Sequence, residues 1–295
     1  VKDWLAAGID PDRSTIVLQT EVPAIAELSW FFAMLLPFNR VMKNPTLKTE
    51  IDAKGLGDQY SFGFPLYAVG QCADILAFRP VYVPVGEDQK AHIEMCREVA
   101  RSFNRIYCGV NPKAEDKDFG VPVEQGGAGG LFPIPDALIG RVGRLPGVGD
   151  GKQKMSKSLG NAIFLSDSAK DVQKKVNKIT TGRQSPTEPG DPTNVLFQFV
   201  EAFITDPARI AELKDRYARG DNIGDGHIKQ ELAEAINTLL EPMRQRRAEF
   251  EKPGGDDAVI DIIRAGTKRA NVVAEETLFL AKQAMKLDFG KRTLG

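Results

Sequence analysis

The chain has 295 residues, of which 42% are hydrophobic and 27% are charged, and its formal net charge is −1. This composition is typical of a globular protein with one large or two moderate domains, and it excludes a disordered or strongly basic chain. Any contact with nucleic acid must therefore be made through a local basic patch.

The scattered cysteines Cys72, Cys96 and Cys108 form no C-x-x-C pair. They argue against a disulfide framework and a zinc site, and they favour a reducing, cytoplasmic location. The start of the chain has no signal-peptide pattern. The longest apolar stretch, SWFFAMLLPF at 29–38, has about half of the ~20 residues that a membrane span needs, so we predict a buried core segment and no membrane association.

The first part of the chain predicts a parallel α/β sheet. STIVLQT at 14–20, VYVPVG at 81–86 and ALIGRVGRL at 137–145 are strand candidates. A helical repeat directly follows the second of these, and its apolar face is made by Ile93, Cys96, Ala100 and Phe103. Strand, glycine turn and helix form the unit of a Rossmann-like sheet, whose ligands bind at the carboxyl ends of the strands.

The later part of the chain predicts helices. SDSAKDVQKKVNKI at 166–179 is typical of a basic helix, with Ser166 or Asp167 as its N-cap. A proline-rich linker follows, and two long apolar repeats occupy 227–247 and 268–285. We therefore divide the chain into two domains. They are an α/β, Rossmann-like, parallel-sheet domain over 1–172 and an all-helical domain over 173–295.

The stretch GKQKMSKSLG at 151–160 places three lysines and two serines on a loop that follows a glycine-rich run. It does not match a P-loop, because Gln153 stands where a serine or threonine should follow Lys152. Flexible lysines of this kind can follow the charge of a polyphosphate as it moves during a reaction. A solvated basic loop without a role is the alternative interpretation.

KMSKS at 154–158 matches letter for letter the signature of class I aminoacyl-tRNA synthetases. VPVGEDQKAHIE at 83–94 resembles the tryptophanyl-tRNA synthetase family, and so do TEVPAIAELSW at 20–30 and GQCADIL at 70–76. The tyrosyl enzymes, which usually carry a GSDQ-type version of the second segment, are the alternative within the class. The resemblance implies that the first predicted domain is catalytic and that the second binds the anticodon.

The resemblance also implies a reaction and its site residues. L-tryptophan would react with ATP to give tryptophanyl-adenylate and pyrophosphate, and tryptophan would then pass to tRNA(Trp). Mg²⁺ would accompany ATP, without a metal bound by the protein itself. The implied catalytic residues, which contact the ATP phosphates, are Lys154 and Lys157. The other implied ATP-binding residues are Gly86, Glu87, Asp88, Leu145, Met155, Ser156 and Ser158. The implied tryptophan-binding residues are Tyr67, Gln71, Asp74 and Gln89.

Asp74 has a physical argument of its own. It stands in an apolar helical run, where an ionised carboxylate is costly without a donor. Tyr67, Gln71 and Asp74 are spaced i, i+4 and i+7, so they share one helix face. An indole N–H can only donate, and a carboxylate is its natural buried acceptor. An N-cap or an ion pair is the alternative role for Asp74, and Gln71 stands where many relatives have methionine.

The first ATP signature of the class, H-x-G-H, is not found, because the histidines are His92 and His227 and neither precedes a suitable glycine. The resemblance starts at KDWLAAGIDP, which lies further into the family's sequences, so we expect the first βαβ portion to be absent from this chain. A non-catalytic tryptophan- or tRNA-binding paralogue or fragment is therefore the hypothesis from a different class. His92 is a minor candidate for a site role.

Partners are predicted from charge and from the resemblance. Eight Lys or Arg and two Asp lie between 151 and 183, a local basic patch that suits tRNA acceptor phosphates. A solvated helix face explains part of this patch equally well. The resemblance implies a homodimer with its interface near 40–130, to which the apolar stretch 29–38 can contribute.

Overall fold

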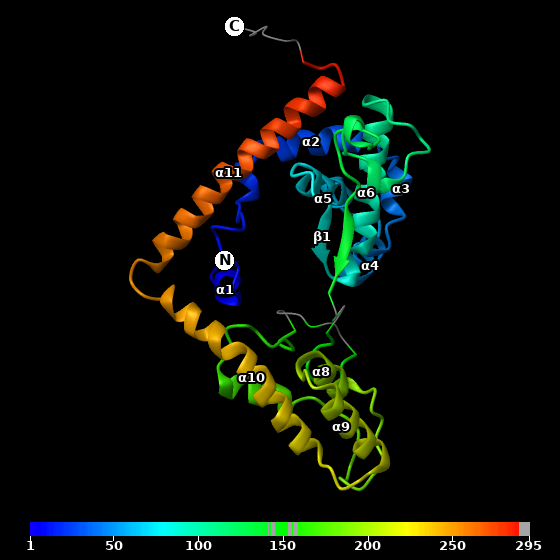
Figure 1. The fold of residues 1–295 in the computed structure, drawn as a ribbon. Coiled ribbons are helices and arrows are strands. Elements are labelled where there is room, and N and C mark those ends of the chain that lie inside the picture. The colour runs from blue at the N-terminus through cyan, green and yellow to red at the C-terminus, as the bar shows by residue number, and fades with distance from the viewer. Residues whose placement is uncertain (141, 143–144, 153–154, 156–158, 289–295) are drawn as a thin grey trace. The chain divides into compact units, whose positions relative to one another are not determined.

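The computed structural model describes residues 1–140, 142, 145–152, 155 and 159–288. The chain forms two compact units (Figure 1). The first, called here the 144–260 unit, consists of Val1–Ser14 and Arg144–Ile260. The second, called the 15–143 unit, consists of Thr15–Gly143 and Asp261–Gly295. Each unit encloses an apolar core of its own.

The 15–143 unit combines a small parallel sheet with helices. Its strands β1 (Tyr82–Val85) and β2 (Asp136–Ile139) pair in parallel, with Tyr82 opposite Asp136. Its helices are α2 (Pro23–Ala33), α3 (Phe38–Met42), α4 (Pro45–Lys54), α5 (Gly63–Leu76), α6 (Lys90–Tyr107) and the part of α11 (Gly255–Ala284) from Asp261 onward. Four 3-10 turns are Gln19–Glu21, Glu87–Gln89, Asp116–Asp118 and Val123–Gln125.

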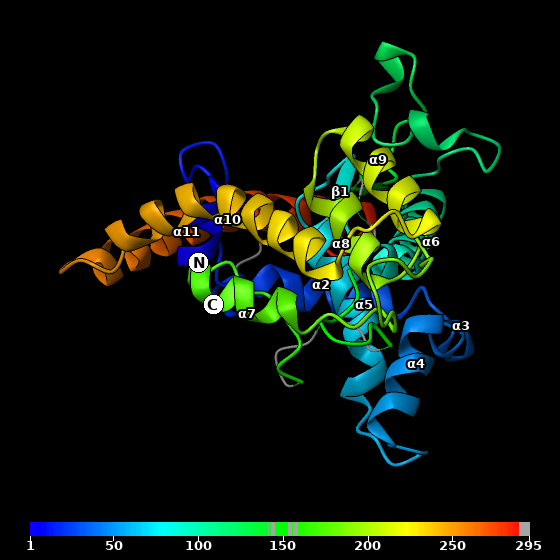
Figure 2. The ribbon, with the colours of Figure 1, turned by 90° about the horizontal axis from the view of Figure 1, so that it is seen from below.

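Helices α2, α5 and α6 build the core of the 15–143 unit. Helix α5 packs against both α2 and α6, and α2 and α5 can be followed again in Figure 2. The apolar repeat of α6 is buried as its periodicity predicts, and it includes Cys96 and Phe103. The Phe103 ring lies edge-on to Phe132, with 4.9 Å between centroids, and Phe32 meets Phe132 at 5.6 Å. These packed rings form part of the apolar core of the 15–143 unit.

The 144–260 unit is helical. Its helices are α1 (Lys2–Ala7), α7 (Ala169–Asn177), α8 (Val195–Phe203), α9 (Pro207–Arg219), α10 (Asp225–Glu249) and the first residues of α11. Side-chain oxygens of Asn194 and Asp206 accept from backbone N–H groups at the starts of α8 and α9, which satisfies donors that a helix leaves unpaired. Phe197 and Tyr217 meet edge to face in the core, with 4.8 Å between centroids.

Several predicted elements need correction. The predicted strand 14–20 is absent, because this segment has no ladder partner in the described residues and ends in the 3-10 turn at Gln19–Glu21. The strand predicted over 137–145 ends at Ile139. Helix α7 is capped by Ser168, whose hydroxyl accepts from the Asp171 N–H at 3.1 Å, and not by Ser166 or Asp167. Strand formation depends on a partner, which a local pattern does not report.

The compact units also cut the chain differently from the predicted division at 172/173. Segment 144–172 lies in the mainly helical unit, and the later part of α11 lies in the unit that holds the sheet. Ala270, Ala274 and Leu278 of α11 are buried in the core of the 15–143 unit. The apolar repeat of α11 predicted the helix correctly, but a repeat does not identify the segment that covers it.

The apolar stretch 29–38 is only partly buried. Phe32 is fully buried in the core, whereas Trp30 and Met34 are 60% and 63% exposed. In the part of the chain that the structure describes, every helix is too short or too polar to cross a membrane.

Candidate functional site

Helix α5 presents the predicted tryptophan-binding residues on one face. Tyr67, Gln71 and Asp74 are all partly buried, while Ala68, Cys72 and Ala73 face the core behind them. The helix runs from Gly63 to Leu76, so the i, i+4, i+7 spacing does place the three polar groups together. The buried apolar side chains anchor α5 in the core, and this fixes the position of the polar face.

Asp74 is neither an N-cap nor a member of an ion pair among the described residues. Its Oδ1 atom accepts a hydrogen bond of 2.5 Å from Nε2 of Gln19, in the 3-10 turn that precedes α2. Burial raises the pKa of the Asp74 carboxyl, and the Gln19 donor partly opposes this rise by stabilising the charged form. Asp74 is therefore an oriented, half-buried acceptor of hydrogen bonds.

Gln89 joins α5 to the turn between β1 and α6. Nε2 of Gln71 donates to Oε1 of Gln89 at 3.1 Å, and Nε2 of Gln89 lies 3.5 Å from Oδ2 of Asp88. Gly86, Glu87 and Asp88 are exposed at the carboxyl end of β1. This is the edge of a parallel sheet where small ligands bind. The fold thus brings the predicted tryptophan-binding residues and three of the predicted ATP-binding residues into one region of the 15–143 unit.

A second layer of polar side chains lies beside Tyr67. The Tyr67 hydroxyl donates to Oε2 of Glu50 at 3.3 Å, and burial together with Glu50 raises the pKa of Tyr67 to about 12. The buried His92 ring lies 5.7 Å from the Tyr67 ring, and its Nδ1 is 3.3 Å from Nδ2 of Asn44. Because the Asn44 amide nitrogen can only donate, Nδ1 of His92 is the acceptor and the ring is neutral.

Of the KMSKS segment at 154–158, the structure describes Met155 alone. Lys154, Ser156, Lys157 and Ser158 lie outside the described residues. Met155 and Leu145 are described, and both pack against the core of the 144–260 unit. Their predicted contacts with ATP stay predictions.

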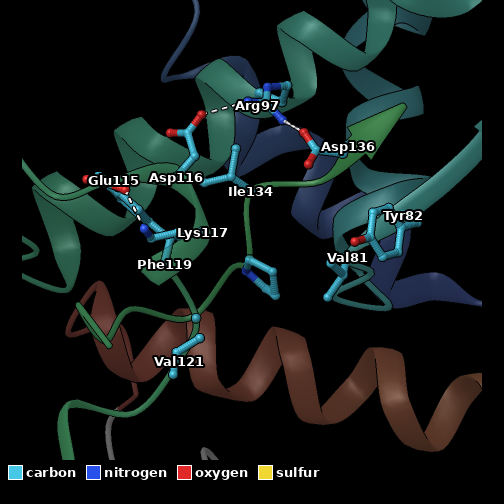
Figure 3. A pocket seen from close by; sticks show the side chains of 12 residues that line it. Val81, Tyr82, Arg97, Glu115, Asp116, Lys117, Phe119, Val121, Ile134 and Asp136 are labelled. Atoms are coloured by element: carbon cyan, nitrogen blue, oxygen red, sulfur yellow. Dashed lines mark hydrogen bonds and ion pairs between the residues drawn. The ribbon is translucent and has the colours of Figure 1, made fainter. Parts of the chain in front are cut away.

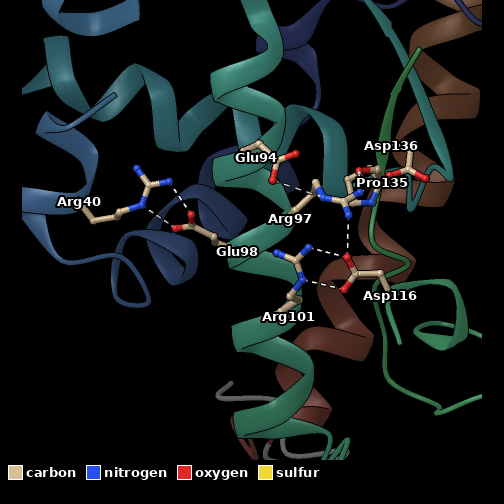
Figure 4. A network of polar contacts seen from close by, with 8 residues as sticks. All are labelled: Arg40, Glu94, Arg97, Glu98, Arg101, Asp116, Pro135 and Asp136. Atoms are coloured by element: carbon tan, nitrogen blue, oxygen red, sulfur yellow. Dashed lines mark hydrogen bonds and ion pairs between the residues drawn. The ribbon is translucent and has the colours of Figure 1, made fainter. Parts of the chain in front are cut away.

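A larger cavity than the groove beside Phe38 lies elsewhere in the 15–143 unit. It measures about 500 Å³ and opens at the amino ends of the strands, beside Val81, Tyr82 and Asp136, opposite to the end that carries Gly86 (Figure 3). Its charged lining is paired internally, since Arg97 bonds to both Asp116 and Asp136 (Figure 4). Although large pockets are the usual first candidates, these charges already have partners, so we do not assign the site here.

Metal-binding side chains are not grouped in the described part of the chain, where no cluster of three or more His, Cys, Asp or Glu could hold an ion. Cys72 and Cys96 are buried and all three cysteines are free.

Three site residues were not predicted from the sequence. Gln19, Glu50 and Asn44 each touch a predicted residue or its neighbour, but they lie 55, 17 and 48 positions away from their partners in the chain. A single polar residue at such a separation carries no periodic signal. Only the position of Gln19, directly before the segment 20–30 that resembles the family, hinted at its place.

Residues 1–241 match the family model described as tRNA synthetases class I (W and Y). The tryptophan–tRNA ligase of Streptococcus pneumoniae is 41% identical over 293 residues, which cover 97% of this chain and 80% of the relative. The ligase of Lactococcus lactis is 40% identical over 294 residues, covering 98% and 80%.

A solved structure agrees with these matches. The tryptophanyl-tRNA synthetase of Campylobacter jejuni, complexed with ADP and tryptophan, superposes with a TM-score of 0.70 at 28% identity and covers 97% of this chain and 81% of its own. The present chain therefore belongs to the tryptophanyl-tRNA synthetases, the tryptophan–tRNA ligases among the class I synthetases for tryptophan and tyrosine.

Proposed function

We propose that the α5 face and the β1–α6 turn form the tryptophan site of this ligase. The observation that carries the proposal is Asp74, a half-buried carboxylate whose only side-chain donor in the described residues is Gln19. An indole N–H would satisfy its remaining acceptor capacity. Phenylalanine would leave the carboxylate without that donor, so such a site rejects it.

Gln89 and Tyr67 would complete the tryptophan site. Gln89 is held by Gln71 on one side and Asp88 on the other, so its amide is available in a fixed place for the α-amino or carboxylate group. The Tyr67 hydroxyl is protonated and uncharged at neutral pH and already donates to Glu50, so Tyr67 would offer its ring to the substrate. A neutral ring beside the pocket suits an aromatic substrate.

ATP would bind along Gly86, Glu87 and Asp88, with Leu145, Met155, Ser156 and Ser158 as further contacts. Lys154 and Lys157 would stabilise the charge that develops on the leaving pyrophosphate, and Mg²⁺ would accompany the nucleotide. This step needs positioning and charge stabilisation more than acid–base chemistry. Support for the lysines comes from the KMSKS match at 154–158.

The wider context of the proposal rests on charge and surface. tRNA(Trp) would meet the basic region between 151 and 183, where Lys170 and Lys174 are exposed. A second copy of the chain would cover the apolar groove of about 130 Å³ beside Phe38 and Phe62, both of which are more than half exposed. A cytoplasmic location is consistent with the free cysteines.

Tryptophan-dependent ATP–pyrophosphate exchange tests the proposal, with tyrosine as the control substrate. We expect exchange with tryptophan only. Lys157→Ala should lower kcat by about 100-fold while leaving tryptophan affinity within about twofold, because its charge acts on the transition state. Lys170→Ala is the matched control, since Lys170 is an exposed lysine of the same basic region and tRNA is absent from the assay.

The outcomes separate the remaining alternatives. Exchange with tyrosine would favour a tyrosyl enzyme, which Asp74 alone cannot exclude because a phenol also donates. Tryptophan binding without exchange would favour a binding module. Equal losses of rate and affinity in Lys157→Ala would contradict the transition-state role of this lysine.

A further inference from the structure

The segment that carries Gln19 is fastened to helix α11. Thr267 Oγ1 accepts from the backbone N–H of Leu18 at 3.0 Å, and the Asn271 amide donates to the backbone carbonyl of Glu21 at 2.7 Å. These two bonds hold the chain immediately before and shortly after Gln19. All of these residues belong to the 15–143 unit. The part of α11 that carries Thr267 and Asn271 therefore supports the turn, and we call it the seat of the turn.

Gly266 allows the segment to approach α11 closely. A Cβ atom at this position would lie 2.0 Å from the carbonyl oxygen of Ile16, far inside van der Waals contact. The neighbouring atom is backbone, so it cannot move aside as a flexible side chain would. The close approach therefore requires glycine at a position where the helix itself does not need one.

Helix α11 also holds the far end of α5. Arg79, just beyond α5, pairs with Glu276 of α11 at 2.7 Å. Thr267 and Glu276 thus connect the same helix to both partners of the Gln19–Asp74 hydrogen bond. Gln19 itself is exposed, so neighbouring side chains do not confine it. Its reach to Asp74 depends on where its backbone is seated.

We propose that Gln19, seated on α11, is a positioning residue for tryptophan selection: it holds the Asp74 carboxylate so that the carboxylate accepts the indole N–H. The inference rests on the proposed role of Asp74 in binding tryptophan. One carboxylate oxygen takes the Gln19 amide, and the carboxylate keeps acceptor capacity for the substrate. Helix α11, which lies late in the chain, thereby contributes to amino-acid recognition without touching the substrate.

The mechanism predicts a change in both affinity and pH dependence. Without Gln19 the carboxylate loses the donor that favours its charged form, so the pKa of Asp74 rises further. No charged side chain of the described residues contributes to this pKa; Arg79 pairs with Glu276, and Tyr67 with Glu50. Tryptophan affinity should fall at low pH as Asp74 becomes protonated, and we call this fall the acid limb of binding. Without Gln19 the acid limb should move to higher pH.

The test is equilibrium dialysis of labelled tryptophan against the full chain, without ATP. Gln19→Ala and Gln19→Glu should each weaken tryptophan binding about five- to tenfold at neutral pH, as expected for a lost hydrogen bond to a charged group. Both should shift the acid limb upward. In the Asp74→Ala background, Gln19→Ala should have no further effect, because the two residues act as one unit.

Gly266→Ala tests the seat on α11. It should weaken tryptophan binding in the same direction as Gln19→Ala, because the added methyl displaces the Ile16 backbone. Gly226→Ala is the matched control, since a Cβ atom at this helical glycine of α10 meets nothing within 4 Å. If Gly266→Ala does not fold, the exposed Gln19 variants still decide the inference, with thermal melting as the check on folding.

The outcomes distinguish this inference from the proposed function. If Asp74→Ala leaves tryptophan affinity unchanged, the proposed tryptophan site fails and this inference with it. If Asp74→Ala weakens binding but the Gln19 variants match the unaltered chain in affinity and pH profile, only the positioning role is overturned. Additive losses in the double variant would also overturn it.

Discussion

The buried His92 side chain near the site is held neutral by its surroundings. His92 is only 2% exposed, and burial lowers its pKa, although Glu50 and Asp88 act in the opposite direction. Protonation would also break the contact with Asn44, because both nitrogens of an imidazolium are donors. The neutral ring therefore belongs to the folded structure at physiological pH.

This state of His92 predicts a pH dependence of stability. The pKa of His92 is lower in the folded chain than its unfolded value of 6.5, so the unfolded chain binds more protons as the pH falls below 6.5. The contribution of His92 to the free energy of unfolding is therefore complete above pH 6.5 and is lost as the pH falls toward the folded pKa. For the unaltered chain, the urea midpoint of unfolding should be lower at pH 5.5 than at pH 7.5. The difference between the two midpoints should be smaller for His92→Gln.

His227→Gln supplies the control for this measurement, because His227 is exposed at the start of α10. It should keep the full pH dependence. An identical loss of stability on acidification in the His92→Gln chain would show that other groups cause it.

At the level of elements, the loop 108–135 is tied to α6 by charge. Arg101 binds Asp116 through two hydrogen bonds of 2.7 and 2.5 Å, and Arg97 binds the same carboxylate at 2.6 Å (Figure 4). Arg101 lowers the pKa of Asp116 against the effect of burial. Asn104 adds a buried link, since its side chain bonds to backbone groups of Leu131 and Phe132.

Removing this carboxylate should loosen the loop. Asp116→Ala leaves two partly buried arginines without their shared partner, so we expect a loss of about 1 to 2 kcal/mol in the free energy of unfolding. Limited trypsin digestion should cut faster at Lys113 and Lys117, which lie in this loop.

Glu115→Ala is the control within the same loop. Glu115 pairs only with the exposed Lys117 among the described residues, and an exposed ion pair contributes little. Equal digestion rates for Asp116→Ala and Glu115→Ala would argue that the arginine contacts do not order the loop.

At the level of the whole molecule, two apolar cores predict two separable responses to mutation. Phe103 is fully buried in the 15–143 unit and Leu232 in the 144–260 unit. Phe103→Ala should cost about 3–5 kcal/mol and Leu232→Ala about 2–5 kcal/mol, because each leaves a cavity. Scanning calorimetry should show each variant lowering a different transition.

Helix α11 gives a reason to expect coupling, because it continues through the boundary at 260/261. A single transition lowered equally by both variants would mean that the cores unfold together.

The apolar groove of the 15–143 unit makes the proposed dimer testable. Phe62 is 69% exposed and lines the groove. Phe62→Asp places a charge where a second copy would bury it, so sedimentation should show a shift from dimer to monomer. A monomeric unaltered chain would contradict the proposal, and Asp58→Ala, outside this lining, is the control.

Local patterns determined much of this protein. The apolar face of α6, the β1 strand with its glycine turn, the shared face of Tyr67, Gln71 and Asp74, and the KMSKS match were all readable from short segments. These features depend on residues within a few turns of one another, whose spacing follows the geometry of a helix or a strand.

The tertiary structure decided which distant segments of the chain are in contact. The absent strand at 14–20, the ending of β2 at Ile139, and the burial of late α11 against the sheet unit all depend on distant partners. The pairing of Gln19 with Asp74 joins residues 55 positions apart. Periodicity predicts that a face will be covered, but the covering segment is chosen by packing of the whole chain, so only the folded structure identifies it.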